Sequence, residues 1–395
     1  MPPVLARAST LLALLLVTGC GSGDSKADSG ASIGRASTPS GASGVGGGGG
    51  TTTPSVDWPL PDCASSNISI GFHDLDAGTT LRDVPEGSGF AGCHQIVLLA
   101  EPGVLLAVCD FDLYRSTDAG CQFEVLDDTC SYEQVVAAPD GGAYAFCRVR
   151  GPGLEPLFVA IDGDTVAYRD AEPPPRALQL AVNPEDADHV RLFTSDREIH
   201  ESSDRGETWA EAGAIPSNGG YAPTRSVGLD PTDFDHFVLS DWDFVWFTDD
   251  GGDSFVRAMF EFDGRQYDES SMGEVLLFPS EPARVYAYGE LKDGASTVAG
   301  SDGLYESTDG GRSFVRSDSP GPSSYAHPTR SGEVYAIELQ TTGSGSYPRF
   351  TGTHLFQTVD GVRTQFELDG SLLATLAFSP ADPDFLYLGS KPAPW

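Results

Sequence analysis

The feature that most constrains the fold of this chain is a short phrase that occurs four times. The copies are STDAGCQF (Ser116 to Phe123), SSDRGETW (Ser202 to Trp209), TDDGGDSF (Thr248 to Phe255) and STDGGRSF (Ser307 to Phe314). All keep the frame hydroxyl-x-Asp-x-Gly-x-x-aromatic. A catalytic motif is normally used once, so a phrase repeated every few dozen residues indicates repeated architecture.

Between these copies the chain predicts short β-strands. Apolar runs rich in Val, Leu, Phe and Tyr are separated by Gly, Pro and Asp clusters, and no amphipathic helix pattern of useful length is present. Two apolar runs joined by a Pro/Asp turn recur, as in LAVNPEDADHVRLF (Leu180 to Phe193) and VGLDPTDFDHFVLS (Val227 to Ser240). With one strand on each side of the repeated phrase, the unit has four strands. A ring of such units is a β-propeller.

Counting the aspartates of the repeated turn predicts seven blades. Asp118, Asp204, Asp250 and Asp309 are clear, and three eroded copies are placed at Asp76, Asp162 and Asp360. We therefore expect an all-β fold, a seven-bladed propeller of four-stranded antiparallel blades, over residues 57–395. The closing blade is predicted to be shared, with residues 68–84 supplying its third and fourth strands and residues 372–390 its first two.

The repeats resemble the Asp-box, or BNR, repeat of sialidase-like and sortilin-like propellers. The resemblance is specific for fold and unspecific for activity. Glycines in the phrase suit positive φ, the Asp and hydroxyl side chains suit bonds to the turn's own backbone, and the aromatics suit packing between sheets. The residues predicted to have this structural role are Ser116, Asp118, Gly120, Phe123, Ser202, Asp204, Gly206, Trp209, Thr248, Asp250, Gly252, Phe255, Ser307, Asp309, Gly311 and Phe314.

The N-terminus reads as an export signal followed by a tether. Residues 1–19 contain Arg7 and the apolar run LLALLLV, and they end in Val-Thr-Gly before Cys20, which resembles the lipobox of bacterial lipoproteins. That resemblance implies lipidation at Cys20 and a membrane partner through the anchor. Gly21 follows the cysteine, which favours the outer membrane or cell surface over the inner membrane. Residues 20–56, rich in Gly, Ser and Thr, are expected to form a flexible tether.

The remaining cysteines indicate disulfides. An even number in an exported chain favours pairing, and no zinc-type Cys-x-x-Cys spacing occurs. All are expected to join strands of the first blades, with the connectivity left open: Cys63, Cys93, Cys109, Cys121, Cys130 and Cys147.

The charge balance limits the class of partner. The chain has 23 Lys and Arg against 58 Asp and Glu. Nucleic acid is excluded as a partner because phosphate contacts need a basic patch. The acidic surface is read mainly as a solvated surface, with a divalent cation or a cationic partner as the alternative. No cofactor and no metal ligand is assigned, although Ca²⁺ is kept open.

The family resemblance implies that the repeated turns lie on the lower rim and that ligands meet the opposite face. In SDWDF (Ser240 to Phe244) an aromatic ring flanked by carboxylates suits a sugar or a cation. The loops of that face give these ligand-binding candidates: Trp242, Asp241, Asp243, Arg197, Tyr221, Arg225, Arg265, Tyr267, Tyr347 and Arg349.

No catalytic residue is assigned. Sialidase-like enzymes place their first arginine in an Arg-Ile-Pro type motif, and that motif is missing here: Arg82 lies in LRDVP and Arg115 in YRSTD. The favoured interpretation is a lipid-anchored, non-catalytic binding or assembly module for a protein or glycan ligand. The alternative is a glycan-active glycoside hydrolase on a sialidase-like scaffold. A third interpretation is a calcium-stabilised surface protein.

Overall fold

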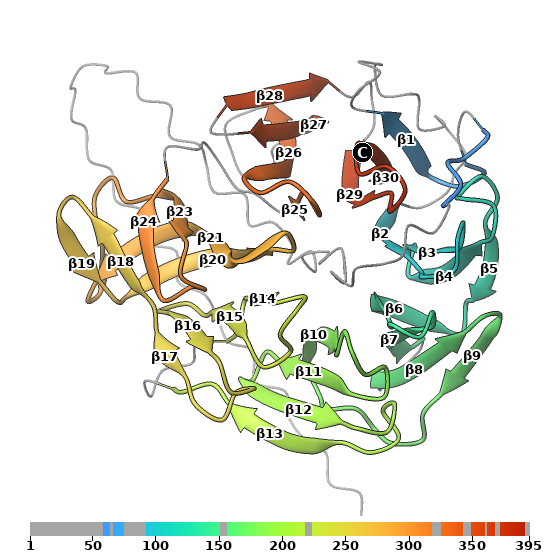
Figure 1. Cartoon of the computed structure of the whole chain (residues 1–395), viewed down its shortest axis with the longest axis horizontal. Coiled ribbons are helices and arrows are strands. Elements are labelled where there is room, and N and C mark those ends of the chain that lie inside the picture. The colour runs from blue at the N-terminus through green and yellow to red at the C-terminus, as the bar shows by residue number, and fades with distance from the viewer. Residues whose placement is uncertain are drawn as a thin grey trace, which may run out of the picture. The chain divides into compact units, whose positions relative to one another are not determined.

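Short apolar runs fold into antiparallel strands, and each successive stretch of chain forms a separate sheet (Figure 1). The computed structural model describes residues 58–63, 66–74, 92–150, 156–217, 223–317, 325–342, 349–359, 362–367 and 372–391. These residues all belong to one compact unit, residues 38–395. They form strands and connecting turns with no helix. The expectation of an all-β propeller is therefore confirmed.

Four of the blades are plain four-stranded meanders, and a fifth has the same order with a short first strand. Their strands are β2 (Cys93–Leu98), β3 (Leu105–Cys109), β4 (Asp112–Ser116) and β5 (Glu124–Asp127); β6 (Cys130–Ala137), β7 (Ala143–Val149), β8 (Pro156–Asp162) and β9 (Thr165–Tyr168); β10 (Ala177–Val182), β11 (Val190–Thr194), β12 (Glu198–Ser202) and β13 (Ala210–Ala214); β14 (Ser226–Leu229), β15 (Phe237–Ser240), β16 (Val245–Thr248) and β17 (Val256–Arg257); and β25 (Tyr325–Ala326), β26 (Glu333–Thr342), β27 (Arg349–Val359) and β28 (Val362–Glu367). In each the first strand lies innermost and the fourth outermost (Figure 1).

One blade is larger than the sequence predicts. Its strands are β20 (Ser270–Phe278), β21 (Glu281–Asp293), β23 (Gly303–Ser307) and β24 (Ser313–Arg316), with β22 (Ser296–Thr297) paired to β21. A hairpin of β18 (Met259–Phe262) and β19 (Arg265–Tyr267) extends the outer edge, and β18 pairs with β24 in parallel. The segment containing Arg265 and Tyr267 was expected to be a loop and is a hairpin.

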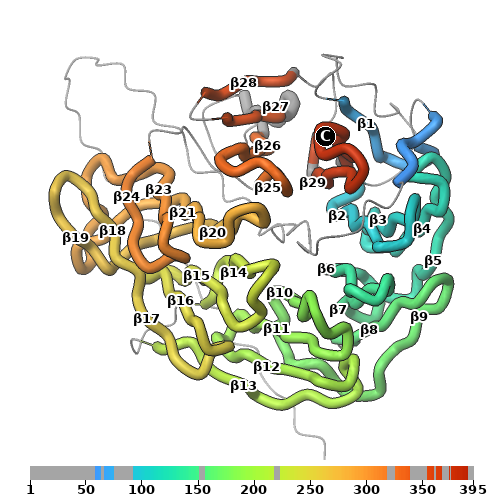
Figure 2. Tube along the Cα trace, viewed as in Figure 1, coloured from blue at the N-terminus to red at the C-terminus, as the bar shows by residue number. Residues whose placement is uncertain are grey.

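The two ends of the propeller share a sheet. β1 (Ile70–Asp74) pairs antiparallel with β30 (Phe385–Lys391), which pairs with β29 (Leu372–Phe378). The colours of Figure 2 follow the chain around the blades until blue β1 stands beside red β29 and β30. This sheet has three described strands, and the pairing of β1 with β30 joins the N-terminal side of the propeller to its C-terminal side.

The prediction of seven four-stranded blades is wrong. Within the described ranges six blades have four strands or more, and the sheet of β1, β29 and β30 has three. From the N-terminal side the described residues supply β1 alone. Residues 75–84, which were expected to complete the third and fourth strands, lie outside the described residues together with Asp76. Asp360 also lies outside them. Asp162 ends β8 beside a two-residue hairpin turn, paired with Thr165.

Neighbouring blades are held together by apolar side chains from both. One buried cluster joins Leu106 and Val108 of β3 to Val135 of β6, and another joins the β10–β13 and β14–β17 blades. In the second cluster the Phe193 and Phe237 rings meet edge to face with 5.0 Å between centroids. Apolar burial of this kind is the main favourable term in the folding free energy.

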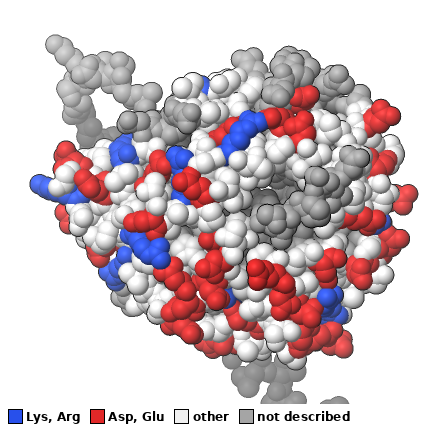
Figure 3. All heavy atoms as spheres, viewed as in Figure 1, with Lys and Arg blue, Asp and Glu red and all other residues white. Residues whose placement is uncertain are grey.

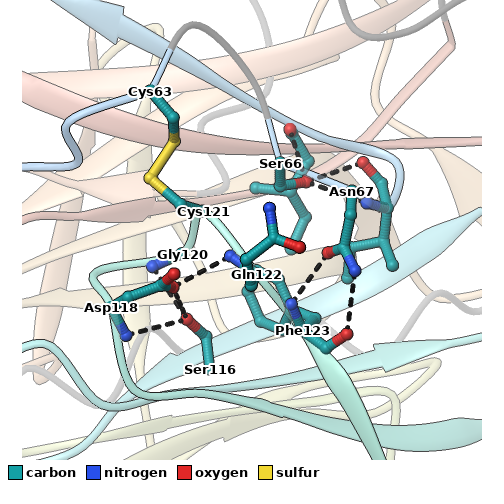
Figure 4. The surroundings of a disulfide bond; sticks show 11 residues. Cys63, Ser66, Asn67, Ser116, Asp118, Gly120, Cys121, Gln122 and Phe123 are labelled. Carbon is teal, nitrogen blue, oxygen red and sulfur yellow. Dashed lines mark hydrogen bonds between the residues drawn. A yellow bond between two sulfur atoms is a disulfide. The ribbon is translucent and has the colours of Figure 1, made fainter.

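The six cysteines form three disulfides, as expected. They are Cys63–Cys121, Cys93–Cys109 and Cys130–Cys147. Two join strands within a blade, β2 to β3 and β6 to β7. The third ties the segment before β1 to the repeated turn after β4 (Figure 4). Beside it Asn67 accepts a hydrogen bond from the Phe123 amide at 2.8 Å and donates to the Phe123 carbonyl at 3.0 Å.

Each clear copy of the repeated phrase forms the same hydrogen-bonded turn. In the first copy the Ser116 hydroxyl donates to Asp118 at 2.8 Å and accepts from the Gly120 amide at 2.9 Å (Figure 4). The Asp118 carboxylate also accepts from the Gln122 amide at 2.8 Å. The other three turns repeat these bonds around Asp204, Asp250 and Asp309.

No helix long and apolar enough to cross a bilayer occurs in the residues that the structure describes. Cys20 and the predicted signal and tether segments lie outside that part of the chain.

Candidate functional site

The loops between the second and third strands of successive blades lie on one face of the propeller, which we call the loop face. The repeated turns, between third and fourth strands, lie at the other end of the same strands. On the loop face the β14–β17 blade carries the loop Asp241–Phe244, which joins β15 to β16. This loop holds three of the ligand-binding candidates.

Asp241 is a structural residue of this loop. It has no exposed surface, and one carboxylate oxygen accepts from the amides of Asp243 and Phe244, both at 2.7 Å. The other oxygen accepts from the Trp246 indole at 3.0 Å and pairs with the Arg197 guanidinium at 3.0 Å. A buried carboxylate needs this many donors to offset its desolvation. Asp241 therefore fixes the loop and links it to the neighbouring blade.

Arg197 supports the same loop from the turn between β11 and β12. Its φ of +78° turns the backbone back on itself. Its side chain donates to the carbonyls of Ile215 and Pro216 as well as pairing with Asp241. The Arg197 guanidinium therefore holds the Asp241–Phe244 loop in place and joins the β10–β13 blade to the β14–β17 blade at the loop face.

Trp242 stands at the tip of this loop. Its side chain is 43% exposed, and the Arg225 guanidinium lies over its ring at 4.1 Å from the centroid. Lys292, from the β20–β24 blade, donates to the Trp242 carbonyl and pairs with Asp243 at 3.0 Å. We call Trp242, Arg225, Asp243 and Lys292, with Asp241 beneath them, the Trp242 platform. It draws on two adjacent blades, and Arg197 braces it from a third.

Three buried hydroxyl groups flank the platform and have no hydrogen-bond partner among the described residues. They belong to Thr224, Ser240 and Ser270. Thr224 directly precedes Arg225 in the chain, and Ser240 directly precedes Asp241. Ser270 lies next to Asp243, because the Ser270 amide donates to the Asp243 carbonyl. Ser270 and Ser240 have no exposed surface and Thr224 has 4%. Together with the ring and the cations they give the loop face a polar site around one exposed aromatic.

The other candidates lie elsewhere. Arg265 is exposed and Tyr267 half-buried on β19, at the outer edge of its sheet, so they do not join the platform. Tyr221 and Tyr347 lie outside the described residues. Arg349 begins β27, and its side chain is outside the description. The structure therefore brings together Trp242, Asp241, Asp243, Arg197 and Arg225 of the predicted set.

The sequence reasoning did not identify the polar residues that connect the innermost strands. Gln95 on β2 donates to the Val135 carbonyl at 2.7 Å and accepts from its amide at 2.8 Å. Gln134 on β6 accepts from the Leu180 amide at 2.6 Å, and Ser226 on β14 accepts from the Val275 amide at 3.2 Å. We call these bonds inter-blade clamps. Their signal in the sequence is a polar residue directly before each inner apolar run, as in QIVLL, QVVAA and SVGLD.

Acidic side chains gather on the face seen in Figure 3, over its lower half where β8 to β17 lie. Within the described residues no group of three or more His, Cys, Asp or Glu side chains is arranged as metal ligands would be. Calcium therefore stays a prediction, and a melting temperature that falls on chelation would support it.

The carboxyl groups whose pKa is shifted are all shifted downward. Hydrogen bonds from Thr208 and Ser202 lower the pKa of Asp204 to about 2, and bonds from Ser254 and Thr248 lower that of Asp250 to about 2. Bonds from Tyr335, Gln357 and Arg330 lower the pKa of the buried Glu333 against the effect of its desolvation. These groups are held as carboxylates at neutral pH.

Comparison with known proteins supports the fold. No family model matches the chain. The dispase autolysis-inducing protein of Streptomyces mobaraensis is 28% identical over 347 residues, which are 84% of this chain and 89% of that protein.

Two solved structures are similar to parts of this chain. YCF48 from Cyanidioschyzon merolae has a TM-score of 0.54 at 13% identity, covering 81% of this chain and 97% of its own. YCF48 bound to D1 peptide has a TM-score of 0.49 at 13% identity, covering 85% and 98%. The likeness to the first shows that this chain has a β-propeller fold.

Proposed function

We propose that this chain is a non-catalytic binding module that holds a protein partner against its loop face. The observation that carries the proposal is the Trp242 platform, an exposed tryptophan stacked on Arg225 and held by the buried Asp241. Trp and Arg are enriched among the residues that dominate protein–protein binding energy. A loop already fixed before binding loses little conformational entropy when the partner docks.

A protease that can cleave itself is the partner we propose. The Streptomyces relative is named for inducing autolysis of dispase. A binding module produces such an effect when it presents one protease molecule to another or holds it in a cleavable form. This role needs no catalytic group on the propeller.

Dispase is the probe that tests the proposal. The full-length protein is mixed with dispase, intact dispase is followed on gels over time, and binding is measured by interferometry with proteolysis blocked by an active-site inhibitor. We expect the wild-type protein to bind and to accelerate the loss of intact dispase. Trp242→Ala should weaken binding roughly tenfold or more, as loss of a central aromatic does.

Arg265→Ala is the matched control, because this exposed arginine lies on the outer hairpin and away from the platform. It should bind as the wild type does. A wild-type protein that neither binds dispase nor speeds its loss contradicts the proposal. Equal weakening by both variants would mean that the platform has no special part in binding.

Glycoside hydrolysis is the alternative function. It requires a carboxylic acid whose pKa is raised so that it can protonate the leaving group. Within the described residues every shifted carboxyl has a lowered pKa, so none of them is assigned as that acid. Turnover of fluorogenic glycosides that is lost when carboxylates of the loop face are replaced would reverse the preference.

The cellular place of the module is also a proposal. We propose that Cys20 is lipidated and that residues 20–56 tether the propeller to the bacterial envelope, at the outer membrane or cell surface. The sequence before Cys20 supports this. Mass spectrometry of the N-terminal peptide should find acyl chains on Cys20, and Cys20→Ser should release the protein from the membrane fraction.

A further inference from the structure

A second exposed aromatic residue lies on the loop face, in a backbone conformation that a bulky residue rarely adopts. Phe111 is 54% exposed and sits with Asp110 in the two-residue turn between β3 and β4, since Cys109 pairs directly with Asp112. Asp110 has φ +55° and Phe111 has φ +70°. A hairpin turn of this kind normally uses Asn-Gly or Asp-Gly, because only glycine adopts positive φ without steric cost.

The strain at this turn is not relieved by burial of the ring. The Phe111 ring contacts the His94 ring at 5.5 Å between centroids, and about half of the residue stays exposed. Stability alone would favour glycine at this position, because glycine removes both the strain and the exposed apolar surface. Strain that is kept at an exposed position is a feature of ligand-contacting sites.

The turn is held rigidly from three sides. The Cys93–Cys109 disulfide joins the two strands just below it. The Asp110 amide donates to the Gly92 carbonyl at 3.3 Å, and the Tyr132 amide of the next blade donates to the Phe111 carbonyl at 2.9 Å. The ring is therefore presented in a fixed place, so that docking it costs little conformational entropy.

Acidic residues flank Phe111 in the chain, because Asp110 precedes it in the turn and Asp112 follows it. Asp110 and Asp128 are exposed, and Asp112 is half-buried in an ion pair with Arg150. Burial first, and then the charges of Asp112 and Asp110, raises the pKa of the neighbouring Tyr114. The surface that complements this region is an apolar pocket whose rim carries lysine or arginine side chains.

We propose that Phe111 is a partner-binding residue, which inserts its ring into an apolar pocket with a basic rim on the protein partner. This inference rests on the proposed function, because it takes the partner to be the protein held by the loop face. It adds a second contact, on the β2–β5 blade, to the Trp242 platform on the β14–β17 blade.

Phe111→Gly separates a binding role from a structural one. The substitution removes the ring and relieves the backbone strain, so the melting temperature should stay the same or rise. Binding to inhibited dispase should weaken roughly tenfold or more. Phe111→Tyr keeps the ring and the strain and should bind within about threefold of the wild type.

Asp263→Gly is the matched control. Asp263 has φ +50° in the two-residue turn between β18 and β19, where no aromatic is presented. Aspartate is already favoured at this position of such a turn, so the substitution should leave both the melting temperature and the binding close to those of the wild type.

Each outcome decides the inference. Wild-type affinity in Phe111→Gly, or a melting temperature several degrees lower, overturns it. If Trp242→Ala weakens binding while Phe111→Gly does not, the proposed function stands and this inference fails. If the wild-type protein does not bind dispase at all, both are overturned together.

Discussion

At the scale of single residues, the repeated turn is built from two consecutive residues with positive φ. In the second copy these are Arg205 at +61° and Gly206 at +82°, and in the third both are glycines, Gly251 at +72° and Gly252 at +105°. In each turn the glycine at the second of these two positions also packs against the preceding blade. A Cβ on Gly206 would lie 2.2 Å from the Phe158 ring of β8. The turn is therefore both a backbone corner and a contact between blades.

We expect Gly206→Ala to lower the free energy of unfolding by about 2 to 4 kcal/mol. The methyl group overpacks the contact with Phe158, which costs about 1 to 3 kcal/mol, and places a Cβ in the left-handed region, which costs about 1 kcal/mol more. Urea denaturation measures the change. Gly163→Ala is the control, since Gly163 has φ +56° and no atom within 4 Å of its Cβ position. If both variants lose the same free energy of unfolding, the contact between Gly206 and Phe158 makes no separate contribution to stability.

The carboxylates of the turns predict how stability depends on pH. The pKa of Asp204 and of Asp250 is lowered to about 2 in the folded protein from 3.8. A lowered folded pKa stabilises the fold above the unfolded pKa, and this contribution is lost as the pH falls from about 4 to about 2.

The melting temperature should fall across that window. Asp204→Asn with Asp250→Asn should melt lower at pH 6 and lose less between pH 4 and pH 2, because these side chains no longer titrate. A wild-type profile as shallow as that of the double variant would contradict the assignment.

The repeated turn could be predicted from the sequence because its hydrogen bonds join residues at most four positions apart. Phe111 could not be predicted in the same way. In CDFDLYRS the aromatic looks like the start of a strand. Its outward position depends on a turn of only two residues, which is set by the pairing of Cys109 with Asp112.

At the scale of the element, the inter-blade clamps depend on a recurring irregularity in the innermost strands. β2, β6 and β10 each shift register directly before the clamp position, at Gln95, Gln134 and Gln179. A bulge of this kind redirects a side chain. Here it coincides with a polar side chain that reaches the next blade from β2 and β6. Gln179 on β10 has the same position, and its amide nitrogen has no partner.

This difference gives a matched pair of variants. Gln134→Leu leaves the buried Leu180 amide without its acceptor and should lower the free energy of unfolding by about 1 to 3 kcal/mol. Gln179→Leu removes an amide nitrogen that has no partner among the described residues and should be neutral or only slightly destabilising. Chemical denaturation of both variants is the measurement. Destabilisation by Gln179→Leu as large as that by Gln134→Leu would show that side-chain shape matters here more than the hydrogen bond.

The β18–β19 hairpin shows where element prediction from sequence fails. FDGRQYDE has a short polar pattern that reads as a loop, and its Asp-Gly pair forms the two-residue turn between Phe262 and Arg265. The hairpin is fixed by parallel pairing with β24, where Met259 lies opposite Ser313. That pairing joins residues far apart in the chain, and no local pattern encodes it.

At the scale of the whole propeller, the repeat predicts the architecture but not the completeness of each blade. Alternating apolar runs and turns are local signals, so the kind of sheet and the strand order follow from them. The number of full blades depends on how the two ends of the chain combine. β1 joins β30 across more than three hundred residues, and the eroded copy of the turn at Asp162 marks an ordinary hairpin.

The Cys63–Cys121 disulfide lies next to this closure. It lies just before β1 and fastens that segment to the β2–β5 blade, so that β1 is held between that blade and β30 (Figure 4). The bond joins residues 58 positions apart, and loss of a cross-link of that length lowers the free energy of unfolding by about 4 kcal/mol in the chain-entropy account.

We expect the double variant Cys63→Ser, Cys121→Ser to loosen the shared sheet before any other part of the propeller. Amide hydrogen exchange followed by mass spectrometry should rise first in β1, β29 and β30, since only hydrogen bonds and packing then hold the ends together. The control is Cys130→Ser with Cys147→Ser, which removes a disulfide inside the β6–β9 blade and should raise exchange there. If the first variant instead loosens all blades equally, the propeller unfolds as a single cooperative unit and the disulfide has no special part in its closure.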